Sequence, residues 1–176
     1  DYDMREVLNL VGTKWNIGTF FPGFGTGGYC IPLSSQYVLR EIPDKKKLTL
    51  LRETIKTDNK INILIAKSII KRNVKSVGIL GLSYKGNLKV DILSPVKPFI
   101  KYLKKNKIKV ELFDPFYSSR EIKQKTGLKT FKFPQGLKNF ECIVLSVDHS
   151  HFKKEFELTK KYIKGCKYIL DNMGVW

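Results

Sequence analysis

The sequence lacks a long apolar run, a recognisable leader segment and an initiator methionine. Its longest apolar stretch, Ile61 to Ile70, is interrupted by Asn62, Lys67 and Ser68 and is much shorter than the ~20 residues that a membrane-spanning helix needs. With no anchor or signal sequence, we expect a cytoplasmic protein that has no membrane partner. Because the chain begins DYDMREVL and opens directly on a helical pattern, we interpret it as a fragment.

Cysteine and histidine are also scarce. Cys30, Cys142 and Cys166 are widely spaced, form no CxxC pair and have no histidine at metal-ligand spacing, which indicates a reducing compartment and no metal site. Cys142 opens the apolar run CIVLSV and Cys166 precedes KYIL, so both are expected in the core or at a strand edge. His149 and His151 follow a strand near a cleft but are expected on a loop surface. Cys30 differs because glycines surround it.

Basic residues are abundant, but few of them are arginine. Lys+Arg 33 against Asp+Glu 16 gives a formal net charge of +17, which is typical of proteins that bind nucleic acid. The lysines are spread along the whole chain. Arginine, which is best suited to bidentate phosphate and base contacts, occurs only at Arg5, Arg40, Arg52, Arg72 and Arg120. A basic nucleic-acid-binding domain therefore stays an alternative, but a compositional bias explains the charge more simply, and we expect no specific nucleic-acid partner.

The first part of the chain has helical periodicity on both sides of a glycine-rich segment. A short helix is predicted to end near Gly12. Residues 13–32 contain too many glycines and prolines for a regular element and too many aromatic residues for a flexible linker, so they are predicted to form a structured loop. A helix is then predicted to begin at Ser34 or Ser35, and a second, long helix is predicted over residues 48–72.

After Val74, short apolar runs alternate with helical stretches. The runs SVGILGL, KVELFD, CIVLSV and KYILD are separated by PVKPFIKYLKK, SREIKQKT and FELTKKYI, which have helical character. This alternation predicts an α/β fold with a parallel sheet and helices on both faces, so residues 75–176 should form a Rossmann-like domain. In such sheets, ligands lie beyond the carboxyl ends of the strands. The loops expected there follow Leu82, Asp114, Val147 and Asp171.

The loop after the first strand, GLSYKGN, could hold a nucleotide. Gly78 and Gly81 have only the spacing GxxG, and the next helix is expected near Pro95, so the full fingerprint GxGxxG at a helix start is missing and NAD is not expected to bind here. Tyr84 could cover a base or a sugar, and Lys85 could meet a phosphate as a point charge. Taken alone, these two residues are more typical of ordinary loop surface.

The glycine-rich loop GTGGYCIP around Cys30 could carry catalysis. Adjacent glycines let a substrate approach the backbone closely, and exposed amides could stabilise an oxyanion. A thiol in such a loop is placed to attack a carbonyl carbon. The alternative is a structural thiol in a tight turn, and the spacing alone favours neither interpretation.

Together, these motifs resemble the UDP-glucose/GDP-mannose dehydrogenase family, particularly its UDP-N-acetylhexosamine 6-dehydrogenase branch. FFPGFGTGGYCIP resembles the active-site loop PGxGxGGHCIP, and VGILGLSYKGN resembles the start of the UDP-binding domain. VELFDPF resembles the second strand of that domain, and VLSVDHSHF and YILDNMG resemble its later strand ends. Several motifs in the family's order are far more specific than any one of them.

The resemblance implies that residues 1–73 are the end of a helical central domain that forms a homodimer, and that residues 75–176 are the UDP-binding domain. The NAD-binding domain would be missing, so the fragment alone is expected to be inactive. Cys30 would be the nucleophile that adds to the C6 aldehyde of a UDP-sugar, forming a thiohemiacetal and then a thioester that water hydrolyses. The resemblance assigns substrate binding to Phe21, Gly23, Gly25, Gly27, Gly28, Tyr84 and Lys85.

The sequence also departs from the family pattern. Tyr29 stands where this branch has a His before the cysteine, and Ser34 stands where an acid normally follows the cysteine by four residues. The run KVDILSP replaces an acidic pair and an Arg-Glu-Ser-Pro run, and an arginine expected near the end is replaced around Met173. Because the missing acid would position or activate water, a catalytically lapsed UDP-sugar-binding or dimerising module is the alternative function.

Overall fold

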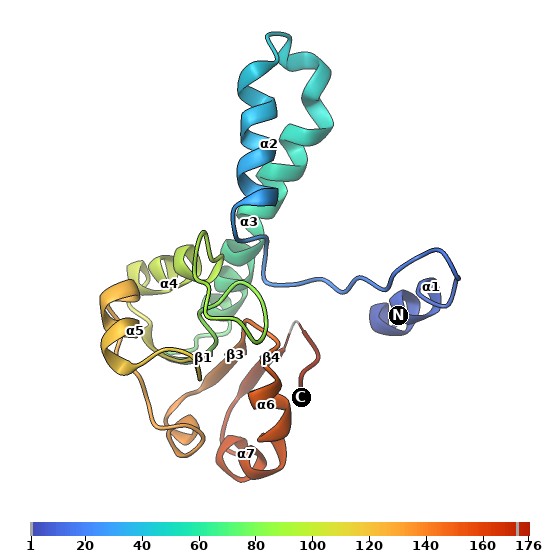
Figure 1. The fold of residues 1–176 in the computed structure, drawn as a ribbon. Coiled ribbons are helices and arrows are strands. Elements are labelled where there is room, and N and C mark those ends of the chain that lie inside the picture. Colours follow the sequence, from blue (N-terminus) through green and yellow to red (C-terminus); the bar gives the residue numbers. More distant parts are fainter. Residues whose placement is uncertain (1, 172) are drawn as a thin grey trace.

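A computed structural model describes residues 2–171 and 173–176. Its body is an α/β unit formed by the later part of the chain. A hairpin of two helices and an amino-terminal arm project from this body in different directions (Figure 1). Within the described residues, no helix combines the length and the apolarity that a membrane span requires.

The α/β unit is built on four parallel strands in the order β2-β1-β3-β4. The strands are β1 (Ser76–Leu80), β2 (Lys109–Phe113), β3 (Cys142–Leu145) and β4 (Tyr168–Asp171). In the register of the sheet, Val77 of β1 lies between Val110 of β2 and Cys142 of β3. The parallel sheet confirms the α/β fold that the alternating pattern predicted.

Alternate residues of the central strands enter two hydrophobic cores. Val77 and Ile79 of β1 belong to a first core, whereas Leu80 belongs to a second core that also contains Phe152. Helices α4 (Val96–Lys105), α5 (Ser119–Thr126) and the end of α3 (Thr49–Lys71) cover the first core. The 3-10 helix η2 (Gln135–Asn139) and helices α6 (Ser150–Lys154) and α7 (Phe156–Ile163) cover the second. The expectation of helices on both faces is therefore confirmed.

The projecting hairpin consists of α2 (Cys30–Glu41) and α3, joined by the 3-10 turn η1 (Lys45–Leu48) (Figure 1). Helix α2 has no fully buried residue. In α3, Ala66 and Ile69 are buried in the first core, so the second half of this helix connects the hairpin to the α/β unit.

Helix α2 begins earlier than the sequence pattern predicted. The expected start at Ser34 or Ser35 is wrong, because the helix begins at Cys30. Pro32 was predicted to belong to the loop. However, proline fits the first turn of a helix, because backbone N–H groups there have no intrahelical acceptor and proline loses no hydrogen bond by lacking one. Cys30 is consequently the first residue of a helix.

The amino-terminal arm contains α1 (Met4–Val11), which Asp3 caps by accepting a 2.8 Å hydrogen bond from the backbone N–H of Arg5. The helix ends at Val11 with Gly12 as its C-cap, as predicted. The segment that follows was predicted to be a structured loop, and its aromatic residues differ in burial. Phe24 is buried and meets Phe99 edge-on at a ring separation of 4.9 Å, whereas Trp15 and Phe20 are exposed because the arm leads away from the body.

Candidate functional site

The candidate site lies at the carboxyl ends of β1, β2 and β3. The chain leaves β1 for β2 on one side, and β3 lies on the other side of β1, which makes the gap between β1 and β3 a topological switch point. The loops after these strands diverge there and leave room for a ligand. As the sequence predicted, these loops meet at one edge of the sheet.

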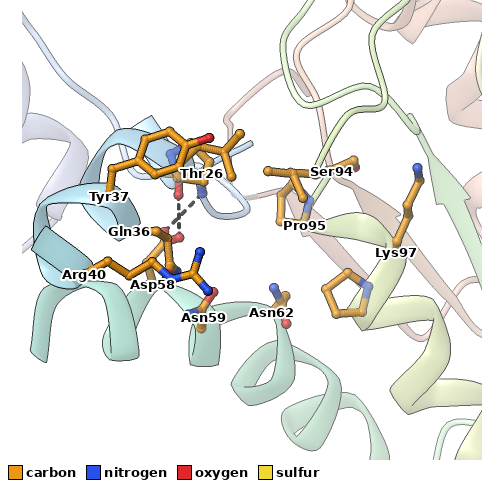
Figure 2. Close-up of a pocket in the computed structure, with 14 residues that line it drawn as sticks. Thr26, Gln36, Tyr37, Arg40, Asp58, Asn59, Asn62, Ser94, Pro95 and Lys97 are labelled. Atoms are coloured by element: carbon orange, nitrogen blue, oxygen red, sulfur yellow. Dashed lines mark hydrogen bonds between the residues drawn. The ribbon is translucent and has the colours of Figure 1, made fainter. Parts of the chain in front are cut away.

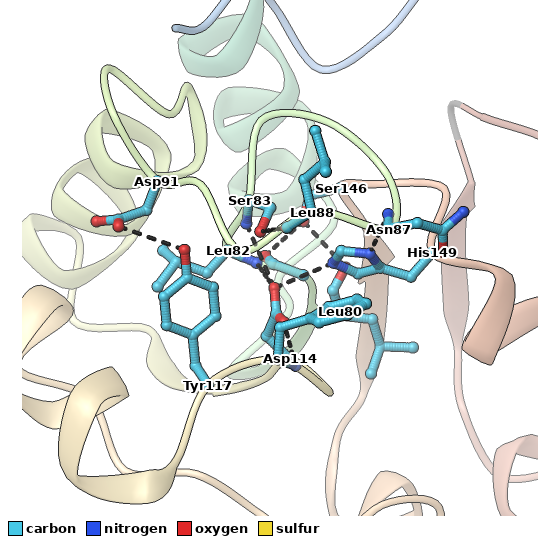
Figure 3. Close-up of polar contacts among 12 residues, drawn as sticks. Leu80, Leu82, Ser83, Asn87, Leu88, Asp91, Asp114, Tyr117, Ser146 and His149 are labelled. Carbon is cyan, nitrogen blue, oxygen red and sulfur yellow. Dashed lines mark hydrogen bonds and ion pairs between the residues drawn. The ribbon is translucent and has the colours of Figure 1, made fainter.

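The turn after β1, residues 82–87, carries Tyr84 and Lys85 and is bonded to the two neighbouring strand ends (Figure 3). Oδ2 of Asp114, just after β2, accepts hydrogen bonds from the N–H groups of Leu82 at 2.7 Å and Ser83 at 3.3 Å. Nδ1 of His149, after β3, accepts a 2.9 Å hydrogen bond from the N–H of Asn87. The turn therefore has partners at both of its ends.

Asp114 and His149 also contact each other, with Nε2 of His149 3.2 Å from Oδ2 of Asp114. Burial opposes ionisation of Asp114, but hydrogen bonds from His149 and from backbone N–H groups outweigh it and lower the pKa of this carboxyl. The expected surface position of His149 is wrong, because its side chain is fully buried. His151 is half-buried and lies beside the rings of Phe113 and Phe133.

The glycine loop before Cys30 packs directly on Tyr84. A Cβ atom added to Gly27 would lie 2.4 Å from Cβ of Tyr84, and one added to Gly28 would lie 2.8 Å from its Cζ atom. Only glycine allows this approach, and Gly28 also has a positive φ of 81°. The N–H of Gly28 donates a 2.9 Å hydrogen bond to the carbonyl of Ile92. Two motifs that are distant in sequence are thus brought together.

Asp58 of α3 holds the same loop from the other side. Its carboxylate accepts a 3.0 Å hydrogen bond from the N–H of Thr26 and a second, short one from the Thr26 hydroxyl. Asp58 was not predicted from the sequence, although it lies in a polar interruption at residues 56–60 of the predicted long helix. Such an interruption on a helix that otherwise has an apolar stripe is a signal for a polar contact.

Cys30 is exposed and stands at the start of α2. Among the described residues, the backbone N–H groups of Cys30 and Ile31 have no hydrogen-bond acceptor, as is usual in the first turn of a helix. The other two thiols were expected in the core or at a strand edge, and they are. Burial raises the pKa of Cys142 to about 12 and also raises the pKa of Cys166, which keeps both as neutral thiols.

The other residues that the sequence predicted for the site differ in their contacts. Lys85 is exposed and has no ion-pair partner among the described residues. Gly25 has a φ of 129°, and an added Cβ would lie 3.0 Å from Cβ of Pro95. A Cβ on Gly23 would lie 3.8 Å from the sulfur of Met173, and the Arg5 guanidinium lies 5.3 Å from the ring centroid of Phe21. Phe21 and Gly23 therefore lie near residues from the two ends of the chain.

A cavity of about 780 Å³ opens behind the Cys30 loop, between α2, α3 and the start of α4 (Figure 2). Thr26 and Asp58 lie on one wall with Arg40, and Pro95 lies on the opposite wall. Asn62 is 4% exposed, and its Oδ1 atom has no hydrogen-bond partner in the described structure. Arg40 and Asn62 could not be predicted for this position from the sequence, because α2 and α3 become neighbours only through the hairpin.

The turn after β1 does not carry the dinucleotide fingerprint. Helix α4 begins at Val96, well past this turn, so the turn does not open directly into a helix as that fingerprint requires. Nor do residues 2–171 and 173–176 contain a group of three or more His, Cys, Asp or Glu side chains that could hold a metal ion.

Comparison with known families gives two matches that together cover most of the chain. Residues 78–176 match the UDP-binding domain of the UDP-glucose/GDP-mannose dehydrogenase family. Residues 1–62 match the central domain of the same family.

Individual relatives are similar over nearly the full chain. A UDP-N-acetyl-D-mannosamine dehydrogenase from Methanococcus aeolicus is 26% identical over 98% of this chain and 38% of its own length. A UDP-N-acetyl-D-glucosamine 6-dehydrogenase from Salmonella typhi is 26% identical over 96% of this chain and 43% of its own length. The chain thus spans about two fifths of the length of these curated relatives.

Solved structures share the fold. A UDP-D-ManNAc dehydrogenase from Pyrococcus horikoshii superposes with a TM-score of 0.75 at 21% identity, covering 99% of this chain and 41% of that one. A UDP-glucose dehydrogenase from Pyrobaculum islandicum gives a TM-score of 0.73 at 18% identity, covering 97% of this chain and 43% of that one.

Proposed function

The chain belongs to the UDP-glucose/GDP-mannose dehydrogenase family, and on that premise we propose that it is the thiol-bearing and UDP-binding portion of a cytoplasmic, NAD-dependent UDP-sugar 6-dehydrogenase. The observation that supports this is the packing of the Cys30 loop on Tyr84 through Gly27 and Gly28. A nucleotide-sugar held at the Tyr84 turn would then extend toward the thiol.

In this proposal, the turn after β1 binds the nucleotide. Tyr84, half-buried against the glycine loop, covers one face of the uridine or sugar. Lys85 is exposed and meets the diphosphate as a point charge. Gly25, Gly27 and Gly28 would line the substrate site by letting the loop backbone lie close to Pro95 and Tyr84. Phe21 and Gly23, nearer the chain ends, would close the outer side of the site.

Cys30 would carry the covalent chemistry. Its sulfur forms a bond to C6 of the sugar aldehyde, and the carbonyl oxygen becomes an oxyanion that the free N–H groups of Cys30 and Ile31 stabilise before it takes up a proton. Oxidation of the resulting thiohemiacetal gives a thioester, which water later hydrolyses to release the carboxylate and the thiol. NAD supplies the oxidation when it is bound, and we place its site on a part of the protein outside this sequence.

We place a homodimer contact on the helical part, residues 1–73. The hairpin exposes large apolar side chains, among them Ile31, Tyr37 and Leu50, which are 68%, 60% and 83% exposed. Apolar surface on this scale is typical of protein contacts. Residues 75–176 would form the separate UDP-binding domain.

A catalytically lapsed UDP-sugar-binding module is the second candidate. Since α2 begins at Cys30, Ser34 lies one helical turn further on the same side of the helix. A serine hydroxyl therefore stands where the family resemblance places a carboxylate, and it is a much weaker base for activating water.

Turnover by the full-length protein tests the proposal. UDP-N-acetylmannosamine, UDP-N-acetylglucosamine and UDP-glucose are each mixed with the protein and NAD, and NADH formation is followed by absorbance. We expect turnover with one of them and a loss of roughly a hundredfold or more in Cys30→Ala. Cys166→Ala removes a thiol that lies outside the glycine loop and should leave the rate unchanged.

The outcomes separate the two candidates. Full activity in Cys30→Ala rules out the nucleophile assignment. UDP binding without turnover, together with turnover gained in Ser34→Asp, favours the lapsed module.

A further inference from the structure

We propose that Asp114 and His149 are positioning residues that together set the conformation of the turn carrying Tyr84 and Lys85 for UDP. This inference rests on the proposed binding of UDP at that turn. Neither residue belongs to the turn, and both side chains are fully buried, so they act on the nucleotide through the backbone that they hold.

The two side chains act on opposite ends of the turn. Asp114 accepts hydrogen bonds from the N–H groups of Leu82 and Ser83, where the chain leaves β1. His149 accepts a hydrogen bond from the N–H of Asn87, where the turn closes. Since Nε2 of His149 contacts Asp114, a continuous chain of contacts runs from Leu82 through Asp114 and His149 to Asn87 (Figure 3). A displacement of either side chain would therefore move the turn that carries the proposed ligand contacts.

The direction of each hydrogen bond fixes the protonation of the imidazole. A backbone N–H can only donate, so Nδ1 of His149 must carry a lone pair, and the ring proton must be on Nε2, where it donates to Asp114. The position thus requires a side chain that accepts at one end and donates at the other. A neutral histidine meets this requirement, as does a glutamine amide, whereas a phenylalanine of similar size does not.

Contacts at the surface support the same turn. The Asn87 side chain donates to the hydroxyl of Ser150 at 2.8 Å and accepts the Ser150 N–H at 2.8 Å. A Cβ on Gly86 would lie 2.4 Å from Oδ1 of Asp148, so the turn packs tightly on the loop that carries His149. Asn87 has a φ of 58°, a left-handed conformation that needs such support in a residue other than glycine.

The test compares three variants of the full chain with the wild type. UDP affinity is measured by calorimetry, and unfolding by urea is followed in parallel so that only folded protein is compared. In His149→Phe, the buried carboxylate of Asp114 and the Asn87 N–H each lose a hydrogen bond, and we expect UDP to bind roughly ten- to hundredfold more weakly. His149→Gln should restore affinity to within about threefold of the wild type, because its amide can both accept and donate.

His151→Phe is the matched control, since it makes the same change two residues along on a half-buried ring. It should leave UDP affinity unchanged. Two further measurements need no substitution. In nitrogen NMR of the wild type, we expect His149 to be neutral with its proton on Nε2. In hydrogen exchange, we expect the backbone N–H of Asn87 to exchange slowly with solvent.

Two results would overturn this inference and leave the proposed function intact. One is equal UDP affinity in folded His149→Phe and the wild type. The other is a proton on Nδ1 of His149, which is incompatible with accepting the Asn87 N–H and can be detected even if the phenylalanine variant does not fold. If the wild type itself does not bind UDP, the proposed function fails and this inference fails with it.

Discussion

At the scale of single residues, Asp91 shows how the protein uses one of its few acidic groups. Its carboxylate lies 2.7 Å from the ammonium of Lys97 on α4 and 2.8 Å from that of Lys125 on α5, and the Tyr117 hydroxyl donates to it at 3.3 Å. Burial alone would raise the pKa of Asp91, but bonds from the two lysines outweigh it and lower the pKa from 3.8 to about 2. In the sequence, Asp91 is recognisable only as part of the run KVDILSP, which departs from the family pattern.

Asp91→Asn should destabilise the protein in a pH-dependent way. A carboxyl whose pKa is lower in the folded state contributes stability that is present above its unfolded value, near 3.8, and lost as the pH falls through about 2. We expect the variant to be less stable by about 2 kcal/mol near neutral pH and the difference to shrink in acid. Urea denaturation of both proteins at a series of pH values measures this difference.

Glu53→Gln is the control for this prediction. Within the described part of the chain, Glu53 pairs only with Lys56, three residues further along α3, and both side chains are 55% exposed. Its replacement should change the free energy of unfolding by less than about 0.5 kcal/mol. A destabilisation by Asp91→Asn that stayed constant from neutral pH to pH ~2 would show that charge is not the source.

At the scale of elements, the end of β1 depends on a glycine. Gly81 has a φ of 108°, and an added Cβ would lie 2.0 Å from Cγ1 of Val147, which follows β3. Its N–H donates to the carbonyl of Phe113 at the end of β2. The three strand ends are therefore close to one another at this residue, directly before the turn that carries Tyr84.

Gly81→Ala should destabilise the fold by roughly 2 kcal/mol or more, since it combines an unfavourable φ with a clash in the core. Gly165→Ala is the matched control, because nothing lies within 4 Å of its added Cβ, and it should change stability by less than about 0.5 kcal/mol. Urea denaturation measures both. Equal stability of the two variants would contradict the close packing at the strand ends.

Helix boundaries show where sequence patterns fail at this scale. The interior of each long helix was predicted from its apolar spacing, but the start of α2 depends on whether Pro32 ends a loop or occupies a first helical turn. Short elements such as α6 and η2 also escaped prediction, because five residues are too few to show a period.

At the scale of the whole molecule, the net charge of +17 predicts weak binding to any polyanion. The lysines are distributed over the chain and not concentrated in one motif, so binding to DNA should be independent of its sequence. Counterion release should make that affinity fall steeply, by about a thousandfold between roughly 50 and 200 mM salt. UDP carries fewer charges, and its affinity should fall by less than about tenfold.

Fluorescence anisotropy with two duplexes of unrelated sequence, at several salt concentrations, measures this prediction. Equal affinities and parallel salt slopes are expected. A persistent preference for one duplex at high salt would instead support the nucleic-acid-binding alternative.

The sequence by itself determined the family, the α/β fold and the motifs that carry the proposed chemistry. It could do so because alternation of apolar runs and the order of the glycine and Tyr-Lys motifs are local features of the chain. It could not determine which side chains support those motifs.

The tertiary structure decided the contacts between distant segments. It packs Gly27 and Gly28 on Tyr84, places Asp58 behind the Cys30 loop, and joins Asp114 to His149. The sheet order β2-β1-β3-β4 brings these strand ends together, and a buried histidine looks like a surface one until its neighbours are known. Local pattern specifies elements, whereas burial and hydrogen-bond partners arise only when elements pack.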